Sequence, residues 1–297
     1  MRILIIGSSQ TKHIVEIYKD CGWGVNTFIK HKGNLFLKAK NLFSLLFADV
    51  VYFVGGVDYK KNRDLRIAKA FGKKIIVHWI GTDVLIQTES FRRNGEKINS
   101  DVVNLAVTPQ LKEELKEAEI ESMYVPIVPA DIPYPSAPEM PKSHAALVYL
   151  PEGREDFYGW SKVKLLAIKN PTIPFYVVAN DGVCEDNLPC NIVFMGTLSH
   201  EQLLELYKKI SILLRVPVHD GLPVMMLEAQ GMGRKVIHPY AFPFAAAPED
   251  KSDASLLKTF EKIVSSPPAL DVDAKRYVDE MFSHKNMVEL YKRNGLA

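Results

Sequence analysis

The segment 213–237 carries the residues with the clearest chemical role in this chain. Its pattern predicts a strand, a loop, a helix and a second strand, and Pro223 suits the first helical turn because it lacks the N–H that would be unpaired there. The amides of Val224 and Met225 would then point outward at the positive end of the helix dipole. Gly221, just before the helix, would let an anion approach closely. These features predict a phosphate-binding helix N-terminus.

Glu228 gives the same helix a second task. It follows Pro223 on the second helical turn, where its carboxylate can accept hydrogen bonds from two neighbouring ribose hydroxyls. A phosphate cradle followed by a ribose acceptor describes a nucleotide site. The alternative is an ordinary strand and helix whose acids cap and solvate, since single helix glutamates are usually surface residues.

The text from Asp220 to Ile237 resembles the E-x(7)-E signature of retaining GT-B glycosyltransferases, the group 1, family 4-like type, whose wording is close to EGLPxxxLEAMAxGxPVI. Asp220 stands at the first acid and keeps its spacing to Glu228. The resemblance implies that Glu228 binds ribose, while Asp220, with its shorter side chain, lies near the donor sugar as a catalytic residue. It covers 191–237 densely and most of the chain thinly. It also places Leu222 and Gly196 among the donor-binding residues.

Basic side chains have to balance the charge that a departing nucleoside diphosphate gains. The family places Arg and Lys in a loop worded like GRxxxxKG after the first strand of its second domain. Here the corresponding positions hold Arg154 and Tyr158, so tyrosine replaces the lysine. Lys162 lies nearby, and Arg215 follows the strand that enters the main motif. We expect Arg154 and Arg215 to be the main phosphate ligands because the guanidinium fork fits phosphate oxygens; the alternative for each is a surface arginine.

A strand in the first half ends in a turn that resembles the family's H-G-[ST]-D. The family's histidine position holds Ile80, and His78 lies two residues earlier on the same strand face. We predict that His78 contacts the donor sugar as a catalytic residue; the alternative is a core histidine. Asp83 has a competing role as a helix cap. The predicted acceptor side consists of Gly7, Ser8, Gly81, Thr82 and Asp83.

Short β-branched runs alternate with amphipathic runs along the chain, which predicts parallel sheets with ligands beyond the strand carboxyl ends. Six prolines between 126 and 141 forbid a continuous helix there. With the resemblance, this predicts an α/β GT-B fold of two facing Rossmann-like domains. The expected bounds are 1–128 plus a returning C-terminal helix 283–297 for the acceptor domain, 129–142 for the linker and 143–282 for the donor domain. Expected strands are 2–6, 24–29, 49–54, 74–80, 102–107, 145–150, 174–179, 191–194, 211–216 and 235–238, and expected helices are 160–169, 199–209, 223–232, 273–282 and 284–293.

The composition limits the class of protein. With 297 residues, 47% of them hydrophobic, the chain can bury two cores, and 37 Lys and Arg against 35 acids give no global field for nucleic acid. No run approaches the roughly 20 apolar residues of a membrane span, and the apolar start is too short for a signal peptide. We therefore expect a cytoplasmic protein. Three unpatterned cysteines predict no metal site, and Asp271-Val-Asp273 is interpreted as a helix cap.

Lysines alternate with aromatic and leucine residues in the segment 30–47. One interpretation is a cationic amphipathic helix that contacts the inner face of a membrane and suits a lipid-linked acceptor. The other is a Rossmann helix that packs its apolar side chains inward.

The expected function is retaining transfer of a hexosyl unit from a nucleotide-diphosphate sugar, UDP or GDP, to a carbohydrate or lipid-linked hydroxyl, without metal or other cofactor. Such a reaction would serve surface polysaccharide or glycolipid assembly. The alternative is a non-catalytic sugar-nucleotide binder or scaffold with a degenerate site. A nucleotide-dependent oxidoreductase is disfavoured because the first strand lacks the glycine fingerprint.

Overall fold

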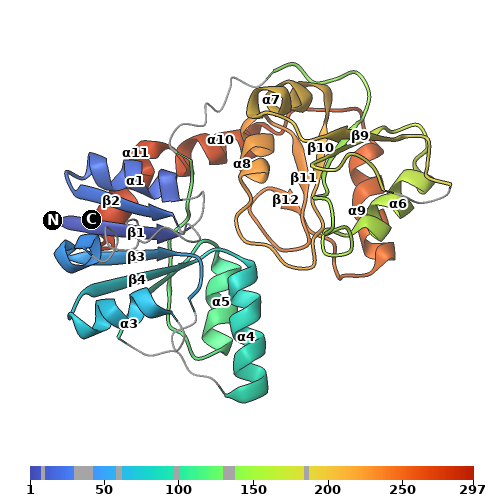
Figure 1. Ribbon diagram of the computed structural model, residues 1–297. Coiled ribbons are helices and arrows are strands. Elements are labelled where there is room, and N and C mark those ends of the chain that lie inside the picture. The colour runs from blue at the N-terminus through green and yellow to red at the C-terminus, as the bar shows by residue number, and fades with distance from the viewer. Residues whose placement is uncertain (8–10, 30–42, 58–61, 96–100, 130–137, 184–186) are drawn as a thin grey trace. The chain divides into compact units, whose positions relative to one another are not determined.

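The chain forms two compact α/β units in the computed structural model (Figure 1). The structure describes residues 1–7, 11–29, 43–57, 62–95, 101–129, 138–183 and 187–297. Unit 1 comprises Met1–Ile132, His219–Leu222 and Phe282–Ala297, and unit 2 comprises Pro133–Val218 and Pro223–Met281.

Unit 1 is built on a parallel sheet in the order β2-β1-β3-β4-β5-β6. The central strands β1, β3 and β4 are apolar along nearly their whole length because helices cover both faces of such a sheet. The described strands are β1 (Arg2–Gly7), β2 (Gly24–Ile29), β3 (Val50–Val54), β4 (Lys74–Trp79), β5 (Val103–Ala106) and β6 (Met123–Tyr124).

The C-terminal helix α11 (His284–Arg293) packs on α1 (Thr11–Asp20) within unit 1, and Figure 1 shows the two side by side. Its Tyr291 is fully buried and faces Tyr18 edge-on, and Tyr18 in turn faces Tyr52 nearly edge-on. The predicted return of the C-terminal helix to the first domain is thus confirmed. The remaining helices of unit 1 are α3 (Arg63–Ala70), α4 (Thr82–Asn94) and α5 (Pro109–Glu117).

Unit 2 is a second parallel sheet in the order β12-β11-β10-β7-β8-β9. Side chains from α6 and α9 pack on it and form a buried core that includes Trp160, Phe175 and Phe260. Its strands are β7 (Ala146–Tyr149), β8 (Phe175–Val178), β9 (Ile192–Gly196), β10 (Ile212–Leu214), β11 (Lys235–Ile237) and β12 (Ala245–Ala246). Its helices are α6 (Trp160–Lys169), α7 (His200–Lys209), α8 (Val224–Gly231), α9 (Asp253–Val264) and α10 (Val272–Met281).

Arg234 ties the end of the proline-rich segment to unit 2. Its side chain is fully buried, and its guanidinium donates to the carbonyls of Tyr207 at 2.9 Å and Glu139 at 3.2 Å. A buried guanidinium keeps its charge only where carbonyls replace the lost water. The proline-rich segment therefore ends in a specific attachment at this point.

Three features differ from the expected elements. The sheets have two more strands than predicted, β6 and β12, each of two residues, and α9 was not predicted. Helix α8 begins at Val224, so Pro223 occupies the N-cap position with extended backbone instead of the first helical turn. The segment His219–Leu222 belongs to unit 1, although it lies within the predicted donor-domain range.

Candidate functional site

The loops at the carboxyl ends of β7, β9 and β10 hold most of the predicted donor-binding residues of unit 2. Arg154 follows β7, Gly196 ends β9, and Arg215 follows β10 directly. Because parallel strands present their carboxyl ends at one edge, these loops gather at one edge of the unit 2 sheet. Ligands of open α/β sheets bind at that edge.

Glu228 lies on the second turn of α8 with only 3% of its surface exposed. One carboxylate oxygen accepts from His200 Nε2 at 2.7 Å, and the other accepts from the Tyr207 hydroxyl at 3.0 Å. Burial and the charge of Glu228 raise the pKa of Tyr207 well above its usual value, so the phenol stays a donor. Each oxygen retains a lone pair, and the carboxylate is held at a defined position.

The two predicted arginines share an aromatic cluster with Tyr158. The Arg215 guanidinium lies 5.0 Å from the ring centroid of Tyr149 and 5.5 Å from that of Tyr158. The Arg154 guanidinium lies 5.2 Å from the Tyr158 centroid and 4.5 Å from that of Phe157. Cations over ring faces are attracted by the ring quadrupole. Tyr158, at the family's lysine position, thus contacts both arginines and brings them to one place.

The first turn of α8 follows the loop after β10, in which Arg215 lies. Pro223 is the N-cap and provides no side-chain cap, and Val224 and Met225 are half-buried. The first amides of a helix have no partner within the helix, so this N-terminus can accept an anion. Leu222 is buried and Gly196 has a φ of 64°, which suits glycine. Lys162 on α6 donates to the Lys251 carbonyl at 3.0 Å.

Asp220 and Gly221 lie in the part of the loop that belongs to unit 1. Asp220 is half-buried and accepts from the Gly221 amide at 3.0 Å. A Cβ at Gly221 would lie 1.9 Å from the Ile80 carbonyl oxygen, so glycine is needed here for contact with protein backbone. This backbone contact is a structural reason for the glycine, and the approach of an anion stays a prediction. The neighbouring His219 is bonded to Glu114 at 2.8 Å.

His78 is completely buried in unit 1, and both ring nitrogens are bonded. Its Nδ1 is 2.6 Å from the Tyr52 hydroxyl, and its Nε2 is 2.7 Å from the Val125 carbonyl oxygen. Because a carbonyl only accepts, Nε2 donates and Nδ1 accepts from Tyr52. The hydroxyl of Tyr291 on α11 lies 3.4 Å from the hydroxyl of Tyr52 and completes the chain of hydrogen bonds. The geometry argues for the core-histidine alternative and against the predicted sugar contact of His78.

Burial lowers the pKa of His78 to about 3, from an ordinary value of 6.5. Between these pH values the unfolded chain binds a proton at this residue and the folded chain does not. The contribution of neutral His78 to the free energy of unfolding is therefore fully present above pH 6.5 and is lost as the pH is lowered toward 3. We expect this residue to cost about 2 kcal/mol of unfolding free energy between pH 7 and pH 5. His78→Gln, whose amide can accept from Tyr52 and donate to Val125, should show a shallower loss in urea titrations at the two pH values. Equal losses in both proteins would contradict a neutral buried His78.

Asp83 clamps the turns after β3 and β4. Its carboxylate accepts from the amides of Gly56, Ile80 and Gly81 at 2.5, 3.0 and 2.6 Å. Burial raises the pKa of Asp83, although these hydrogen bonds oppose the rise. The position is N-terminal in α4, but the N-cap itself is Gly81. The structural role of Asp83 is therefore the one that the geometry supports.

Gly7 and Thr82, two other predicted acceptor-side residues, lie at the carboxyl ends of β1 and β4. Thr82 is exposed. A Cβ added at Gly7 would lie 2.7 Å from Val54, so a larger residue would not fit there without a shift. Ser8 lies outside the described residues, as does most of the segment 30–47. Within 43–47, Phe43 is 63% exposed and Leu45 is buried, which fits either interpretation of that segment.

His200, Tyr207 and Tyr149 are site residues that the sequence analysis did not select. Tyr207 and His200 lie on α7, one helix before Glu228, and only the fold brings them to its carboxylate. Tyr149 ends β7 next to β10, where Arg215 follows. A signal existed for Tyr149, because aromatic residues at adjacent strand ends are natural partners for an arginine.

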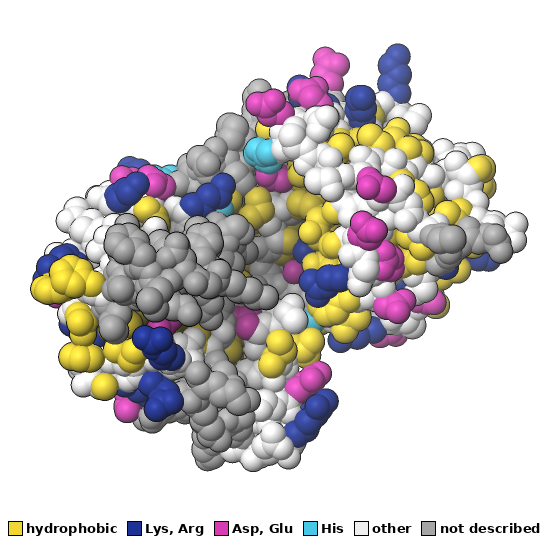
Figure 2. Space-filling model, viewed as in Figure 1, with side chains coloured by type: hydrophobic (Ala, Val, Ile, Leu, Met, Phe, Trp, Pro, Cys, Tyr) yellow, Lys and Arg dark blue, Asp and Glu magenta, His cyan; other side chains and the backbone are white. Residues whose placement is uncertain are grey.

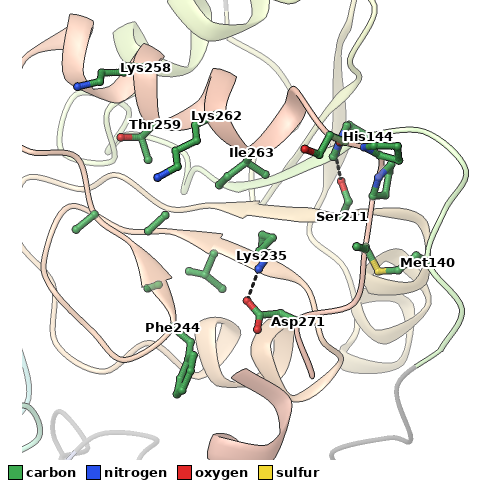
Figure 3. A pocket seen from close by; sticks show the side chains of 18 of the residues that line it. Met140, His144, Ser211, Lys235, Phe244, Lys258, Thr259, Lys262, Ile263 and Asp271 are labelled. Atoms are coloured by element: carbon green, nitrogen blue, oxygen red, sulfur yellow. Dashed lines mark hydrogen bonds and ion pairs between the residues drawn. The ribbon is translucent and has the colours of Figure 1, made fainter. Parts of the chain in front are cut away.

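A large hollow of unit 2 lies away from these residues (Figure 3). It measures about 670 Å³, and its lining includes His144, Ser211 and Lys235, which lie at or before the amino ends of β7, β10 and β11. In Figure 3, Ser211 bonds to His144 and Lys235 pairs with Asp271. Because ligands of parallel sheets bind at the carboxyl edge, we place the candidate site with Glu228 and the arginines.

No group of three or more His, Cys, Asp or Glu side chains in the described part of the chain is arranged to hold a metal ion. No helix within the described ranges has both the length and the apolar character needed to cross a membrane.

No protein-family model and no curated protein matches the sequence. Among solved structures, sucrose-phosphate synthase from Thermosynechococcus elongatus has a TM-score of 0.68 at 11% identity, over 99% of both chains. Pneumococcal O-GlcNAc transferase GtfA, in complex with UDP and GlcNAc, has a TM-score of 0.60 at 12% identity, over 87% of this chain and 59% of that chain. A mutant of S. aureus TarM, in complex with fondaparinux, alpha-GlcNAc-glycerol and UDP, has a TM-score of 0.57 at 12% identity, over 85% and 58%.

These similarities establish the fold. The two parallel sheets and their helices form the α/β GT-B fold, as predicted. The chain spans less than two thirds of the GtfA and TarM chains.

Proposed function

We propose that this protein is a glycosyltransferase that moves a hexosyl unit from a nucleotide-diphosphate sugar to an acceptor hydroxyl with retention of configuration. The observation that carries the proposal is the arrangement in unit 2, where a positioned carboxylate, a helix N-terminus and two arginines lie at the carboxyl edge of one sheet. This combination suits a ribose followed by two phosphates. Glycosyltransferases of the same fold carry UDP in their structures.

In this proposal Glu228 accepts hydrogen bonds from the ribose hydroxyls, and the α8 amides with Arg154 and Arg215 bind the diphosphate. The bond between the anomeric carbon and the phosphate oxygen breaks, and the acceptor oxygen bonds to that carbon on the same face. The acceptor proton passes to a phosphate oxygen of the leaving group. Amides and guanidinium groups stabilise the charge that develops there, so the reaction needs no metal or other cofactor. Asp220 is assigned to the donor sugar on the resemblance of the motif.

A second candidate function is sugar-nucleotide binding without transfer. Buried His78 and Tyr158 at the lysine position favour it, because both depart from the family's catalytic pattern. Binding without turnover would distinguish it from the transferase. We further propose that the acceptor is a carbohydrate or lipid-linked hydroxyl in surface polysaccharide or glycolipid assembly. The proposed location is the cytoplasm or the inner face of a membrane.

The test is a panel of UDP, GDP, ADP and CMP sugars measured by thermal shift and calorimetry, with and without EDTA. We expect one nucleotide, UDP or GDP, to stabilise the protein by about 2.7 kcal/mol at a hundredfold excess over its Kd. EDTA should leave both binding and the slow release of nucleoside diphosphate unchanged. Failure of every nucleotide to bind would refute the site, and binding without release in the presence of candidate acceptors would favour the second candidate function.

A further inference from the structure

The amino edge of the unit 1 sheet carries exposed aromatic side chains on the segments that enter two adjacent strands. Phe47 lies three residues before β3 and is 48% exposed, and Phe71 lies three residues before β4 and is 58% exposed. Val50 is paired with Lys74 at the first positions of these strands, so the two segments enter the sheet side by side. Single exposed apolar residues are ordinary, whereas a group of them at one place marks a contact surface.

The helical residues 43–47 turn an aromatic stripe away from the core. Phe43 is 63% exposed and lies one turn before Phe47, and the two ring centroids are 4.4 Å apart. Leu45 on the opposite side of the turn is buried, so it provides the packing of this segment on unit 1. Two stacked rings contribute little to folding while much of their apolar area stays in water. The stripe is therefore available to an apolar phase outside the protein.

Three cations lie beside this stripe. The Arg2 guanidinium is 5.8 Å from the ring centroid of Phe47. Lys73 donates from its ammonium to the Leu46 carbonyl at 2.7 Å, and Lys74 follows it as an exposed residue at the start of β4. An ammonium has three donors, so one bond to a carbonyl leaves Lys73 able to bind an anion. Figure 2 shows hydrophobic side chains next to Lys and Arg side chains at the end of unit 1 where Figure 1 marks the N-terminus.

The charge around the rings is mainly positive. Asp49 is the one acid among residues 1–2, 43–49 and 71–74. Residues 30–42, which lie outside the described part of the chain, hold four lysines and no acid. Cores of protein interfaces are depleted in charged residues, whereas the headgroup region of a bilayer takes up aromatic rings and cations together. The mixture on this edge therefore matches an anionic membrane better than it matches a protein partner.

We propose that this edge of unit 1 docks on a bilayer that contains anionic lipid. The three rings enter the boundary between headgroups and acyl chains, and the three cations meet lipid phosphates. Strands β1 and β4 have six residues each, so Gly7 and Thr82 at the other edge lie about 20 Å from this face. The contact thus anchors the protein and leaves the loops after the strands open to solution. The membrane-docking face consists of Arg2, Phe43, Phe47, Phe71, Lys73 and Lys74.

Co-sedimentation with lipid vesicles tests the proposal. We expect the wild type to sediment with vesicles of phosphatidylcholine and phosphatidylglycerol, and to stay in solution with phosphatidylcholine alone. The variant Phe43→Ala, Phe47→Ala should lower the partition coefficient at least about tenfold, because two rings no longer leave water. The variant Arg2→Gln, Lys74→Gln should lower it about 25-fold, since each cation near an anionic surface accounts for about a fivefold gain. Added salt should weaken binding of the wild type toward the level of the second variant.

The variant Lys12→Gln, Ile86→Ala is the matched control. Both residues are exposed, and they lie in the first two turns of α1 and α4, near the opposite edge of the sheet. This variant should partition as the wild type does, and melting temperatures show whether each variant is folded. Phe47→Trp should shift its fluorescence emission to the blue when anionic vesicles are added, whereas Ile86→Trp should not.

Sedimentation of the wild type with neither kind of vesicle would overturn the proposal and leave a protein as the partner of this face. Equal binding to both kinds of vesicle, or an equal loss in the control variant, would overturn it as well. Vesicle binding is measured without nucleotide, so the membrane contact and the proposed function stand or fall separately.

Discussion

Replacing Glu228 by alanine is expected to weaken binding of the nucleoside diphosphate by about 10- to 100-fold, the loss of a charged acceptor of one or two hydrogen bonds. The folded structure should tolerate the change, because the Tyr207 hydroxyl also lies 3.2 Å from the Met225 carbonyl and keeps an acceptor. His200 has a side chain that is 48% exposed, so water can replace its lost partner. Calorimetry on the folded variant measures the effect.

The 2′-deoxy form of the same nucleotide identifies the contact. Wild-type protein should prefer the ribonucleotide, and Glu228→Ala should bind both forms equally weakly if the carboxylate contacts the ribose. Glu228→Gln keeps the side-chain shape and an acceptor for Tyr207, and should lie between the two. A variant that still prefers the ribonucleotide would show that Glu228 acts elsewhere.

Arg215→Met is expected to weaken the nucleoside diphosphate by about 30-fold, or about 2 kcal/mol, while leaving the bare nucleoside unchanged. The side chain is 7% exposed and its guanidinium lies against two tyrosine rings, so the cation is held in place before any ligand arrives. A held cation loses little side-chain entropy when it binds a phosphate. The loss should therefore follow ligand charge, in contrast to Glu228→Ala, which affects the nucleoside as well.

Control variants at Arg276 and Tyr158 show whether the effect of Arg215→Met is specific. Arg276→Met removes an exposed arginine on α10 of the same unit and should not change affinity. Tyr158→Phe keeps the ring over which both guanidinium groups lie and should also bind normally, whereas Tyr158→Ala should weaken the diphosphate. Equal weakening of nucleoside and diphosphate by Arg215→Met would mean that the site has collapsed and that the arginine is structural.

The fold could be predicted largely from local patterns. Alternating strands and helices, and the proline-rich segment, indicate two parallel sheets because each of these signals depends on neighbours in the chain. The two-residue strands β6 and β12 carry too few residues for any period. The sequence does contain a signal for helix α9, since Ser252 caps it and Leu256 and Phe260 are one helical turn apart.

The candidate site could be predicted from the sequence only in part. Glu228 and the α8 N-terminus belong to one continuous segment, so their spacing could be interpreted directly. The role of His78 could not be interpreted in this way, because its surroundings depend on Tyr52 from β3 and on Val125 beyond β6. The contact of Arg215 with Tyr149 and Tyr158 likewise joins residues that are far apart in sequence.

The hydrogen-bonded chain from Tyr291 through Tyr52 to His78 has a consequence for how the protein is made. Tyr291 is supplied by α11, which follows all of unit 2 along the chain. A ribosome therefore releases every strand and helix of unit 2 before it releases this core side chain of unit 1. Since domains tend to fold as they emerge, the second unit can reach its final state while the first still waits for its last helix.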